Sequence, residues 1–282
     1  MTQLSSLARI LFALAMAAFA VLTLVSGELI RAPESFAPHP IFLYLSSALL
    51  GASAIAIAVK RLDYLAAIAL GIAFGLCFVL LHMSTLIAQP RDGNAWAAAV
   101  ATLALSGMSL VLAARCLPST AGEGVVRMLG AAGRIMFGVC LPVCGIQHFM
   151  YASFVATFIP AWIPMPLWWA YFTGVCHLAA GVSMITRLWI RSSALLAGLM
   201  FFLFLLLVHV PRVARDPGNV NEWISLFIAV AFCASAWLMA SHAPELSRRT
   251  QGRAQVPRFM DRSARYETFI IDQLRCRQRI HL

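Results

Sequence analysis

The amino-acid sequence predicts an all-α fold, a polytopic bundle of eight transmembrane helices. Three observations predict it. Apolar residues make up 61% of the 282 residues and charged residues 11%, whereas soluble proteins average about 45–50% and about 25%. Eight stretches stay apolar over about 20 residues each, which is the length that crosses the hydrocarbon core of a bilayer. Finally, several polar residues recur in the same order 125 to 127 residues further along the chain.

The composition excludes several classes of protein. The mean hydropathy of +0.84 rules out a soluble enzyme, a disordered regulator and a disulfide-stapled secreted domain. It also argues against a nucleic-acid partner, although the net charge is +10, because so much apolar surface cannot be buried in water by a chain of this length. The expected partner of the chain is therefore the lipid bilayer.

The eight expected spans cross the membrane in alternating directions. None of them carries Asp or Glu in its middle, as expected for segments that lie in hydrocarbon. We place them at about residues 8–29, 41–59, 64–87, 94–114, 128–150, 167–186, 192–211 and 222–241.

The order of the polar residues indicates an internal duplication. His82 and Trp96 are 14 residues apart, and the same spacing separates His209 and Trp223. The offset of 127 also relates Tyr44 to Tyr171, Lys60 to Arg187, Pro90 to Pro217 and Asn94 to Asn221. Four helices is an even number, so both copies enter from the same side and form parallel repeats. We expect a first unit at 1–114, a linker at 115–127, a second unit at 128–242 and a tail at 243–282.

The distribution of Lys and Arg predicts the orientation of the helices. With the N-terminus inside, 17 basic residues lie on the inner side and four on the outer side. The positive-inside rule counts these residues, and it therefore places both termini in the cytoplasm. Nine of the inner arginines lie in the tail at 243–282. The tail is consistent with an interfacial helix on anionic lipid, with a docking segment for a cytoplasmic protein, or with a solvated tail.

The segment around His148 is the strongest candidate for a functional site. His148 follows Gln147 near the outer end of the fifth expected span, and residues 151–166 carry no charge at all. Prolines prevent this connection from forming a regular helix, so we expect it to lie over the protein as an apolar cap. Trp162, Trp169 and Tyr171 fit the outer aromatic belt beside this cap.

Further polar residues are expected near the same outer face. His209 lies at the outer end of the seventh span, close to Arg212, Asn221 and Trp223. His177 lies about ten residues into the sixth span, about 15 Å deep at 1.5 Å per residue. We therefore expect His177 to be too deep to share one small site with His148 and His209.

A metal site is a weaker alternative. Cys140, Cys144 and His148 are spaced to share one helix face, and thiolate and imidazole suit copper, zinc or iron. However, the chain has no CxxC pair, no dinucleotide-binding glycine pattern and no c-type haem motif. The sequence therefore does not favour a bound metal or haem.

The second half of the chain resembles the DoxX-like family of bacterial integral membrane proteins. The resemblance covers about residues 128–241. It rests on the ordered Gly, His, Pro and Trp of four segments, which are 145–149, 160–164, 169–174 and 209–211. Members of this family usually have one four-helix unit, so the chain resembles a duplicated member with a degenerate first copy. That copy has Thr23 in place of His148 and Leu50 in place of His177.

The resemblance implies a subunit of a redox system in the bacterial inner membrane, with a separate redox protein as its partner. Quinone is the cofactor that we would expect on this basis. His148 would bond a quinone carbonyl with Gln147 orienting it, Trp162 and Trp169 would pack on the ring, and His209 with Arg212 would relay protons. Two other hypotheses remain open, which are a carrier of a small solute through a cavity between the repeats and a structural scaffold that binds a partner through its basic tail.

Overall fold

A computed structural model describes residues 2–33 and 36–254 of the chain, with side chains only up to residue 241. The chain comprises two compact units, residues 1–241 and residues 242–282, and every site considered below lies in the first. In the described part the secondary structure is helical, and no residue there belongs to a β-strand. The predicted all-α class is therefore confirmed. The part of the tail from 255 to 282, on which the interfacial-helix hypothesis depends, lies outside the described residues.

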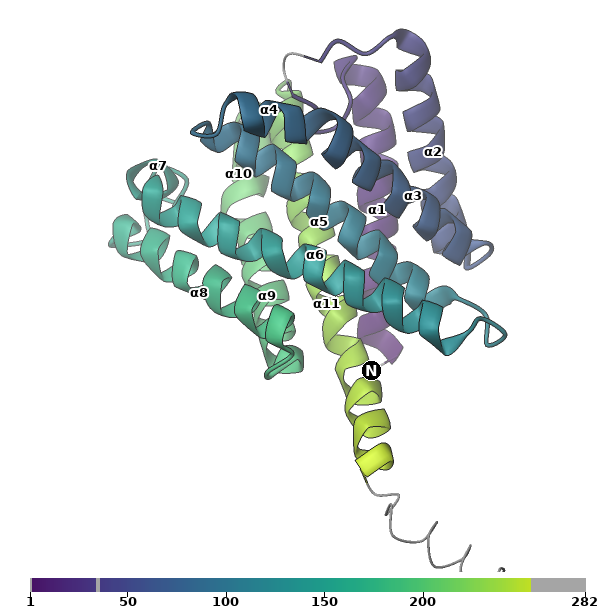
Figure 1. Cartoon of the computed structure of the whole chain (residues 1–282). Coiled ribbons are helices and arrows are strands. Elements are labelled where there is room, and N and C mark those ends of the chain that lie inside the picture. The colour runs from purple at the N-terminus through teal and green to yellow at the C-terminus, as the bar shows by residue number, and fades with distance from the viewer. Residues whose placement is uncertain (1, 34–35, 255–282) are drawn as a thin grey trace, which may run out of the picture. The chain divides into compact units, whose positions relative to one another are not determined.

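The helices of the first half follow the expected spans closely (Figure 1). The third span continues through a π-helical turn, in which each hydrogen bond closes over five residues rather than four. The elements are α1 (Thr2–Ser26), α2 (Pro40–Val59), α3 (Asp63–Cys77), η1 (Phe78–His82), α4 (Met83–Ala88) and α5 (Gly93–Cys116).

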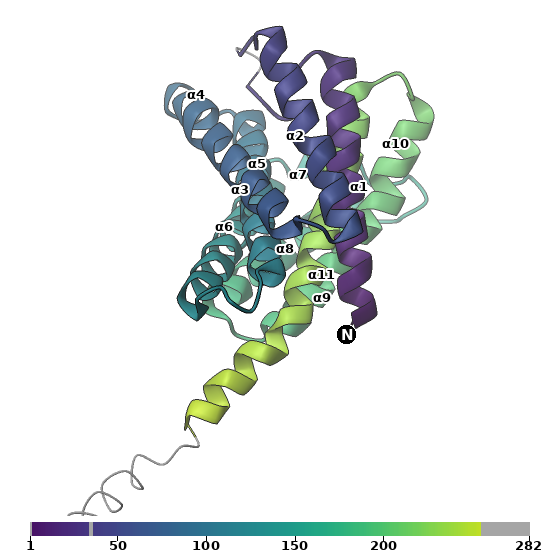
Figure 2. The same cartoon turned by 90° about the vertical axis from the view of Figure 1, so that its right-hand side faces the viewer.

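The helices of the second half repeat this order, with one short helix added after α6 (Figure 2). A second π-helical turn again ends at a histidine. The elements are α6 (Glu123–Met150), α7 (Ala152–Ala156), α8 (Pro166–Thr186), α9 (Ile190–Phe204), η2 (Leu205–His209), α10 (Val210–Arg215) and α11 (Val220–Ala254).

Seven helical segments of the described chain are long and apolar enough to cross a membrane. They indicate a multi-pass membrane protein, as the sequence predicted. The remaining expected span, the sixth at 167–186, coincides with α8, which is a continuous helix but is not one of the seven. The sequence of α8 includes Pro166, two tryptophans, a tyrosine and a histidine. The seven segments are Gln3–Ser26, Pro40–Val59, Asp63–Ala88, Gly93–Cys116, Glu123–Met150, Ile190–Arg215 and Val220–Ser241.

The last helix of each half is the most enclosed. Within its apolar stretch, α5 is 78% buried and the membrane-length part of α11 is 67% buried, whereas α2 is only 22% buried. Helix α5 packs against α3 on one side and against α6 on the other. The contact with α6 is close because Gly107 and Gly133 face each other, and a Cβ atom on either would overlap the carbonyl oxygen of the other. Small residues allow such close packing of helices in membranes.

The two tight turns between neighbouring helices have the same backbone geometry. Lys60 and Leu62 have φ angles of 59° and 54° between α2 and α3. Arg187 and Trp189 have φ angles of 69° and 49° between α8 and α9. Residues other than glycine rarely adopt this left-handed region of φ and ψ. The same unusual conformation therefore recurs at positions separated by 127 residues.

An arginine near the start of each half binds the end of the next helix in the same way. The Arg9 guanidinium donates to the Ile57 carbonyl oxygen at 2.9 Å and pairs with Asp63. The Arg134 guanidinium donates to the carbonyl oxygens of Met184 and Ile185. Each arginine thereby satisfies carbonyl groups that a helix end leaves without partners.

Candidate functional site

Two histidines on neighbouring helices form the centre of the candidate site. The rings of His148 on α6 and His177 on α8 have centroids 4.8 Å apart and are tilted by 36°. Gly145 and Gly174 let the two helices approach, because a Cβ atom on Gly145 would lie 2.8 Å from the Gly174 carbonyl oxygen. His177 is buried, with 2% of its surface exposed.

The expectation that His177 lies too deep to meet His148 was therefore wrong. It took the start of α8 to be level with the end of α6. In the structure, the Tyr171 ring lies 5.8 Å from that of Phe149, so the first residues of α8 extend past the end of α6. Counting residues from the start of α8 therefore overestimates how far His177 lies below His148.

The hydrogen bonds of the two histidines define which nitrogen carries the proton. His148 Nδ1 lies 2.8 Å from the Cys144 carbonyl oxygen, and His177 Nδ1 lies 2.8 Å from the Thr173 carbonyl oxygen. A carbonyl oxygen only accepts, so each Nδ1 must carry a hydrogen. In the neutral imidazole the Nε2 atom is then an acceptor with a free lone pair. Neither Nε2 has a hydrogen-bond partner among the described residues.

Aromatic rings of α9 surround His177. The Phe201 ring is 5.6 Å from the His177 ring at a steep angle, and the Phe204 ring is stacked on it at 6.0 Å. The two imidazoles therefore lie in apolar surroundings, where an acceptor without a partner is costly. This pair can accept hydrogen bonds from a donor such as a hydroxyl group.

Gln147 has a different role from the expected one. Its Nε2 donates to the Gly93 carbonyl oxygen at 2.7 Å, at the start of α5. The side chain therefore points from the second half toward the first and does not orient His148. The sequence could not show this, because Gln147 and Gly93 are separated by 54 residues.

The apolar segment predicted as a cap forms one side of a groove. A cavity of about 470 Å³ lies between residues 157–162 and the wall formed by residues 206–208 and 211–215 of η2 and α10. Trp162 and Arg212 both line it. The Arg212 guanidinium lies 4.3 Å above the Phe158 ring, and its Nε donates to Glu222 Oε2 at 2.7 Å.

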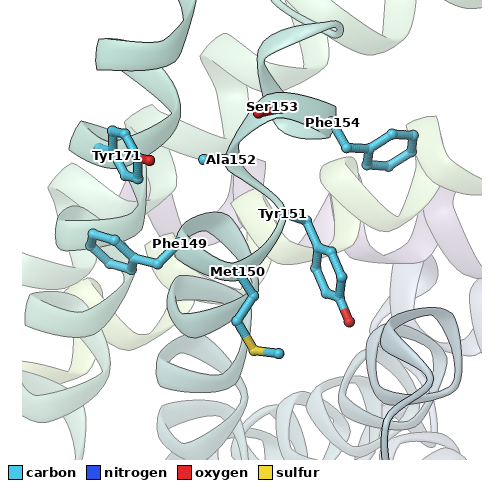
Figure 3. A pocket seen from close by; sticks show the side chains of 7 residues that line it. All are labelled: Phe149, Met150, Tyr151, Ala152, Ser153, Phe154 and Tyr171. Atoms are coloured by element: carbon cyan, nitrogen blue, oxygen red, sulfur yellow. The ribbon is translucent and has the colours of Figure 1, made fainter.

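A second, shallower pocket of about 380 Å³ lies at the end of α6. Figure 3 shows Phe149 and Tyr171 on one side of this pocket and Tyr151 and Phe154 on the other. Tyr171, an expected ligand-binding residue, therefore lines this pocket. The residues that line it include neither His148 nor His177.

The remaining predicted site residues do not meet at His148. Trp223 Nε1 donates to the Pro217 carbonyl oxygen at 3.0 Å, which closes the turn before α11. The Asn221 backbone N–H donates to Asn219 Oδ1 in the same turn. Trp169 packs edge-on against Trp168 at 4.8 Å and is 38% exposed. Trp223 and Asn221 therefore stabilise a turn, and Trp169 belongs to a surface aromatic cluster.

The alternative metal set is not assembled. Cys140 Sγ donates to the Met136 carbonyl oxygen on its own helix at 3.0 Å. Over residues 2–33 and 36–241, no three or more His, Cys, Asp or Glu side chains lie where they could hold a metal ion together. The spacing of Cys140, Cys144 and His148 along α6 therefore does not by itself create a site.

His209 lies beside charged side chains. One of them, Arg31, was not among the site residues expected from the sequence. His209 Nδ1 is buried without a hydrogen-bond partner, and the side chain experiences the charges of Arg212, Glu222 and Arg31. Arg31 comes from the connection between α1 and α2, and its NH2 donates to Ser225 Oγ at 3.2 Å. Burial lowers the pKa of Arg31. As one of only four basic residues expected on the outer side, Arg31 could have been noticed from the sequence.

No known protein family, characterised protein or solved structure matches the chain.

Proposed function

We propose that the chain is an integral membrane subunit of a redox system that binds a quinol, or a small apolar molecule with a similar hydroxyl group, in its second half. One observation carries the proposal: His148 and His177 present two Nε2 acceptors side by side in apolar surroundings. Such a pair can accept a hydrogen bond from a donor. The resemblance to the DoxX-like family, with its implied redox role, agrees with this proposal.

The protonation of the pair specifies the form of the ligand. A quinone carbonyl is an acceptor and cannot bond to an Nε2 lone pair, whereas a quinol hydroxyl donates to it. Binding of the reduced form therefore fits better than the carbonyl contact expected from the sequence. The groove beside residues 157–162 lies near the pair along the chain, because Leu206, on its wall, is two residues from Phe204, which stacks on His177.

Binding of the two redox forms tests the proposal. We would titrate the purified full-length protein in detergent micelles with a short-chain benzoquinol under anaerobic conditions, and separately with the matching quinone. The wild type should bind the quinol more tightly than the quinone. His148→Phe and His177→Phe should each weaken quinol binding at least about tenfold, the equivalent of about 1.4 kcal/mol.

A matched control is His39→Asn. His39 is exposed, and its Nδ1 accepts from the Ile41 backbone N–H at the start of α2, which asparagine can also do. This variant should bind quinol as the wild type does. Equal binding of quinol and quinone, or quinol binding that both phenylalanine variants retain, would overturn the proposal.

We further propose that the two halves are parallel four-helix repeats with both termini in the cytoplasm of a bacterial inner membrane. The matched geometry of Lys60 with Arg187, of Leu62 with Trp189 and of the π-helical turns supports the repeat. The count of Lys and Arg supports the orientation. A redox protein would be the electron partner, and the basic tail would meet anionic lipid or a cytoplasmic protein.

Cysteine labelling tests the orientation. Gly122 and Gly218 lie in connections expected on opposite faces, and neither position has atoms in the way of a new side chain. In intact cells, or in right-side-out vesicles, a membrane-impermeant maleimide should label Gly218→Cys. It should label Gly122→Cys only after permeabilisation. The reverse pattern would show that the orientation is inverted.

A further inference from the structure

Three buried side-chain atoms of the described residues have no hydrogen-bond partner, and they are Thr23 Oγ1, Arg31 Nε and His209 Nδ1. Arg31 lies in the connection between α1 and α2, and His209 lies at the end of η2. Nearly all buried polar atoms in proteins are paired, so each exception calls for an explanation such as a bound ion or molecule. Arg31 is also one of the charged residues close enough to His209 to act on it.

The charges around these atoms do not balance. The described side chains form two ion pairs, Arg9 with Asp63 and Arg212 with Glu222. The second pair uses both oxygens of Glu222, the carboxylate whose charge acts on His209. Arg31 is in neither pair, so its positive charge has no carboxylate partner in the described part of the chain. Arg31 is half-buried, and a partly buried charge without a counter-charge is unfavourable.

The backbone holds Arg31 in place for this contact. Its φ angle is 60°, a left-handed conformation that costs energy for a residue with a side chain. The NH2 group reaches Ser225 Oγ on α11 at 3.2 Å, across 194 residues of sequence. The guanidinium is thus fixed between the connection 27–39 and α11.

His82, the corresponding histidine of the first half, has a hydrogen-bond partner on its ring. His82 Nε2 lies 3.1 Å from Thr102 Oγ1, 20 residues further along the chain. The residue 20 positions after His209 is Ala229, which has no polar side chain. His209 therefore has no counterpart of the Thr102 hydroxyl, and its other ring nitrogen, Nδ1, is buried without a partner.

We propose that Arg31, Ser225 and His209 form a binding site for a phosphate-type oxyanion at the membrane face where α1, α10 and α11 end or begin. An oxyanion would accept hydrogen bonds from Arg31 Nε and from a protonated His209 Nδ1, and it would supply the missing negative charge. The site lies in a connection and at helix ends, at the depth of lipid headgroups. The oxyanion can therefore be a phospholipid headgroup or a free phosphate ion.

Thermal unfolding of the purified full-length protein distinguishes these sources. One arm adds inorganic phosphate against sodium chloride of equal ionic strength, and the other adds phosphatidylglycerol against a galactolipid without phosphate. A ligand that binds only the folded protein raises the unfolding midpoint. For the wild type we expect a rise of a few degrees in at least one arm, with the lipid arm alone responding if the site takes a headgroup.

Arg31→Gln should abolish that rise, and Arg91→Gln is the matched control. Arg91 is an exposed arginine in another connection expected on the same face, so its replacement should leave the rise unchanged. Without added ligand, Arg31→Gln should unfold no earlier than the wild type, because it removes a charge that has no partner. This comparison also shows that the variant folds.

Three results would overturn the proposal. They are a wild-type midpoint that neither phosphate nor phosphatidylglycerol raises, a rise that Arg31→Gln retains in full, and an equal loss in Arg91→Gln. Quinol binding at His148 and His177 is measured separately, so the failure of either proposal leaves the other intact.

Discussion

His82 and His209 each end a π-helical turn, yet only His82 has a hydrogen-bond partner on its ring. The ring of His82 is buried and lies 3.1 Å from Thr102 Oγ1, whereas His209 Nδ1 is buried without a partner. The π-helical turn thus ends in a histidine with a hydrogen-bond partner in the first half and in a histidine with an unpaired nitrogen in the second. We therefore expect removal of the His82 contact to destabilise the protein, and replacement of His209 to have no such cost.

We expect Thr102→Val to destabilise the protein by about 1–3 kcal/mol, because it leaves a buried imidazole nitrogen unsatisfied. Thr102→Ser, which keeps the hydroxyl, should cost less. The free energy of unfolding in detergent micelles measures both.

His209→Leu provides the comparison on the other side. Since His209 Nδ1 loses no hydrogen bond on replacement, the variant should be at least as stable as the wild type when no anion is added. A loss as large as that of Thr102→Val would show that His209 has a partner in the folded protein.

The contact between α5 and α6 gives a second prediction. A Cβ atom on Gly133 would overlap the Gly107 carbonyl oxygen and lie 2.9 Å from Val111 Cγ2. Gly133→Ala should therefore push the two helices apart and cost about 1–3 kcal/mol, as overpacking does. Thermal unfolding of the purified protein measures this loss.

Gly130→Ala is the control on the same helix. Its Cβ atom would meet Ala114 Cβ at 3.7 Å, an ordinary contact, and alanine favours the helix. Its unfolding midpoint should match or exceed that of the wild type. Equal effects of the two substitutions would mean that the close approach of α5 and α6 does not contribute to stability.

The sequence predicted the helices well because apolar length is a local property. Each expected span begins and ends within a few residues of a helix, except that α1 starts earlier, α6 is longer at its start and α11 continues to Ala254. The π-helical turns at Phe78–His82 and Leu205–His209 were not predicted, because each lies inside an apolar run whose length does not distinguish a π-helical from an α-helical turn.

The candidate site was predicted only in part. The sequence singled out His148, His177 and the apolar segment near Trp162, but it did not place His148 and His177 together. The depth of His177 depends on where α8 starts relative to α6, and the direction of Gln147 depends on Gly93 in the other half. Such contacts join residues far apart in the sequence, so spacing alone cannot reveal them.

The two tryptophans at the turns before α5 and α11 give a third prediction. Trp96 Nε1 donates to the Pro90 carbonyl oxygen at 2.9 Å, as Trp223 Nε1 does to that of Pro217. Replacing either tryptophan with phenylalanine should cost about 1 kcal/mol of stability through the lost hydrogen bond. Quinol affinity should stay within about twofold of the wild-type value. A tenfold loss in Trp223→Phe would instead place Trp223 at the ligand.

The Arg212 side chain connects the cap segment to α11, and this link gives the last prediction. Its guanidinium bonds to both carboxylate oxygens of Glu222 and lies 4.3 Å above the Phe158 ring. Arg212→Gln removes both contacts and leaves the more enclosed Glu222 charge unpaired, because the Glu222 side chain is 15% exposed and that of Arg212 36%. We expect it to cost more stability than Glu222→Gln, which keeps the contact with Phe158.

Hydrogen–deuterium exchange distinguishes the two variants locally. Amide exchange in residues 157–162 should accelerate in Arg212→Gln, since the cap segment loses its anchor, and it should accelerate less in Glu222→Gln. Arg215→Gln is the control, because Arg215 lines the same groove but is exposed and forms no ion pair with a described residue. Unchanged exchange in Arg212→Gln would mean that the packing of Phe158 and its neighbours holds the cap without Arg212.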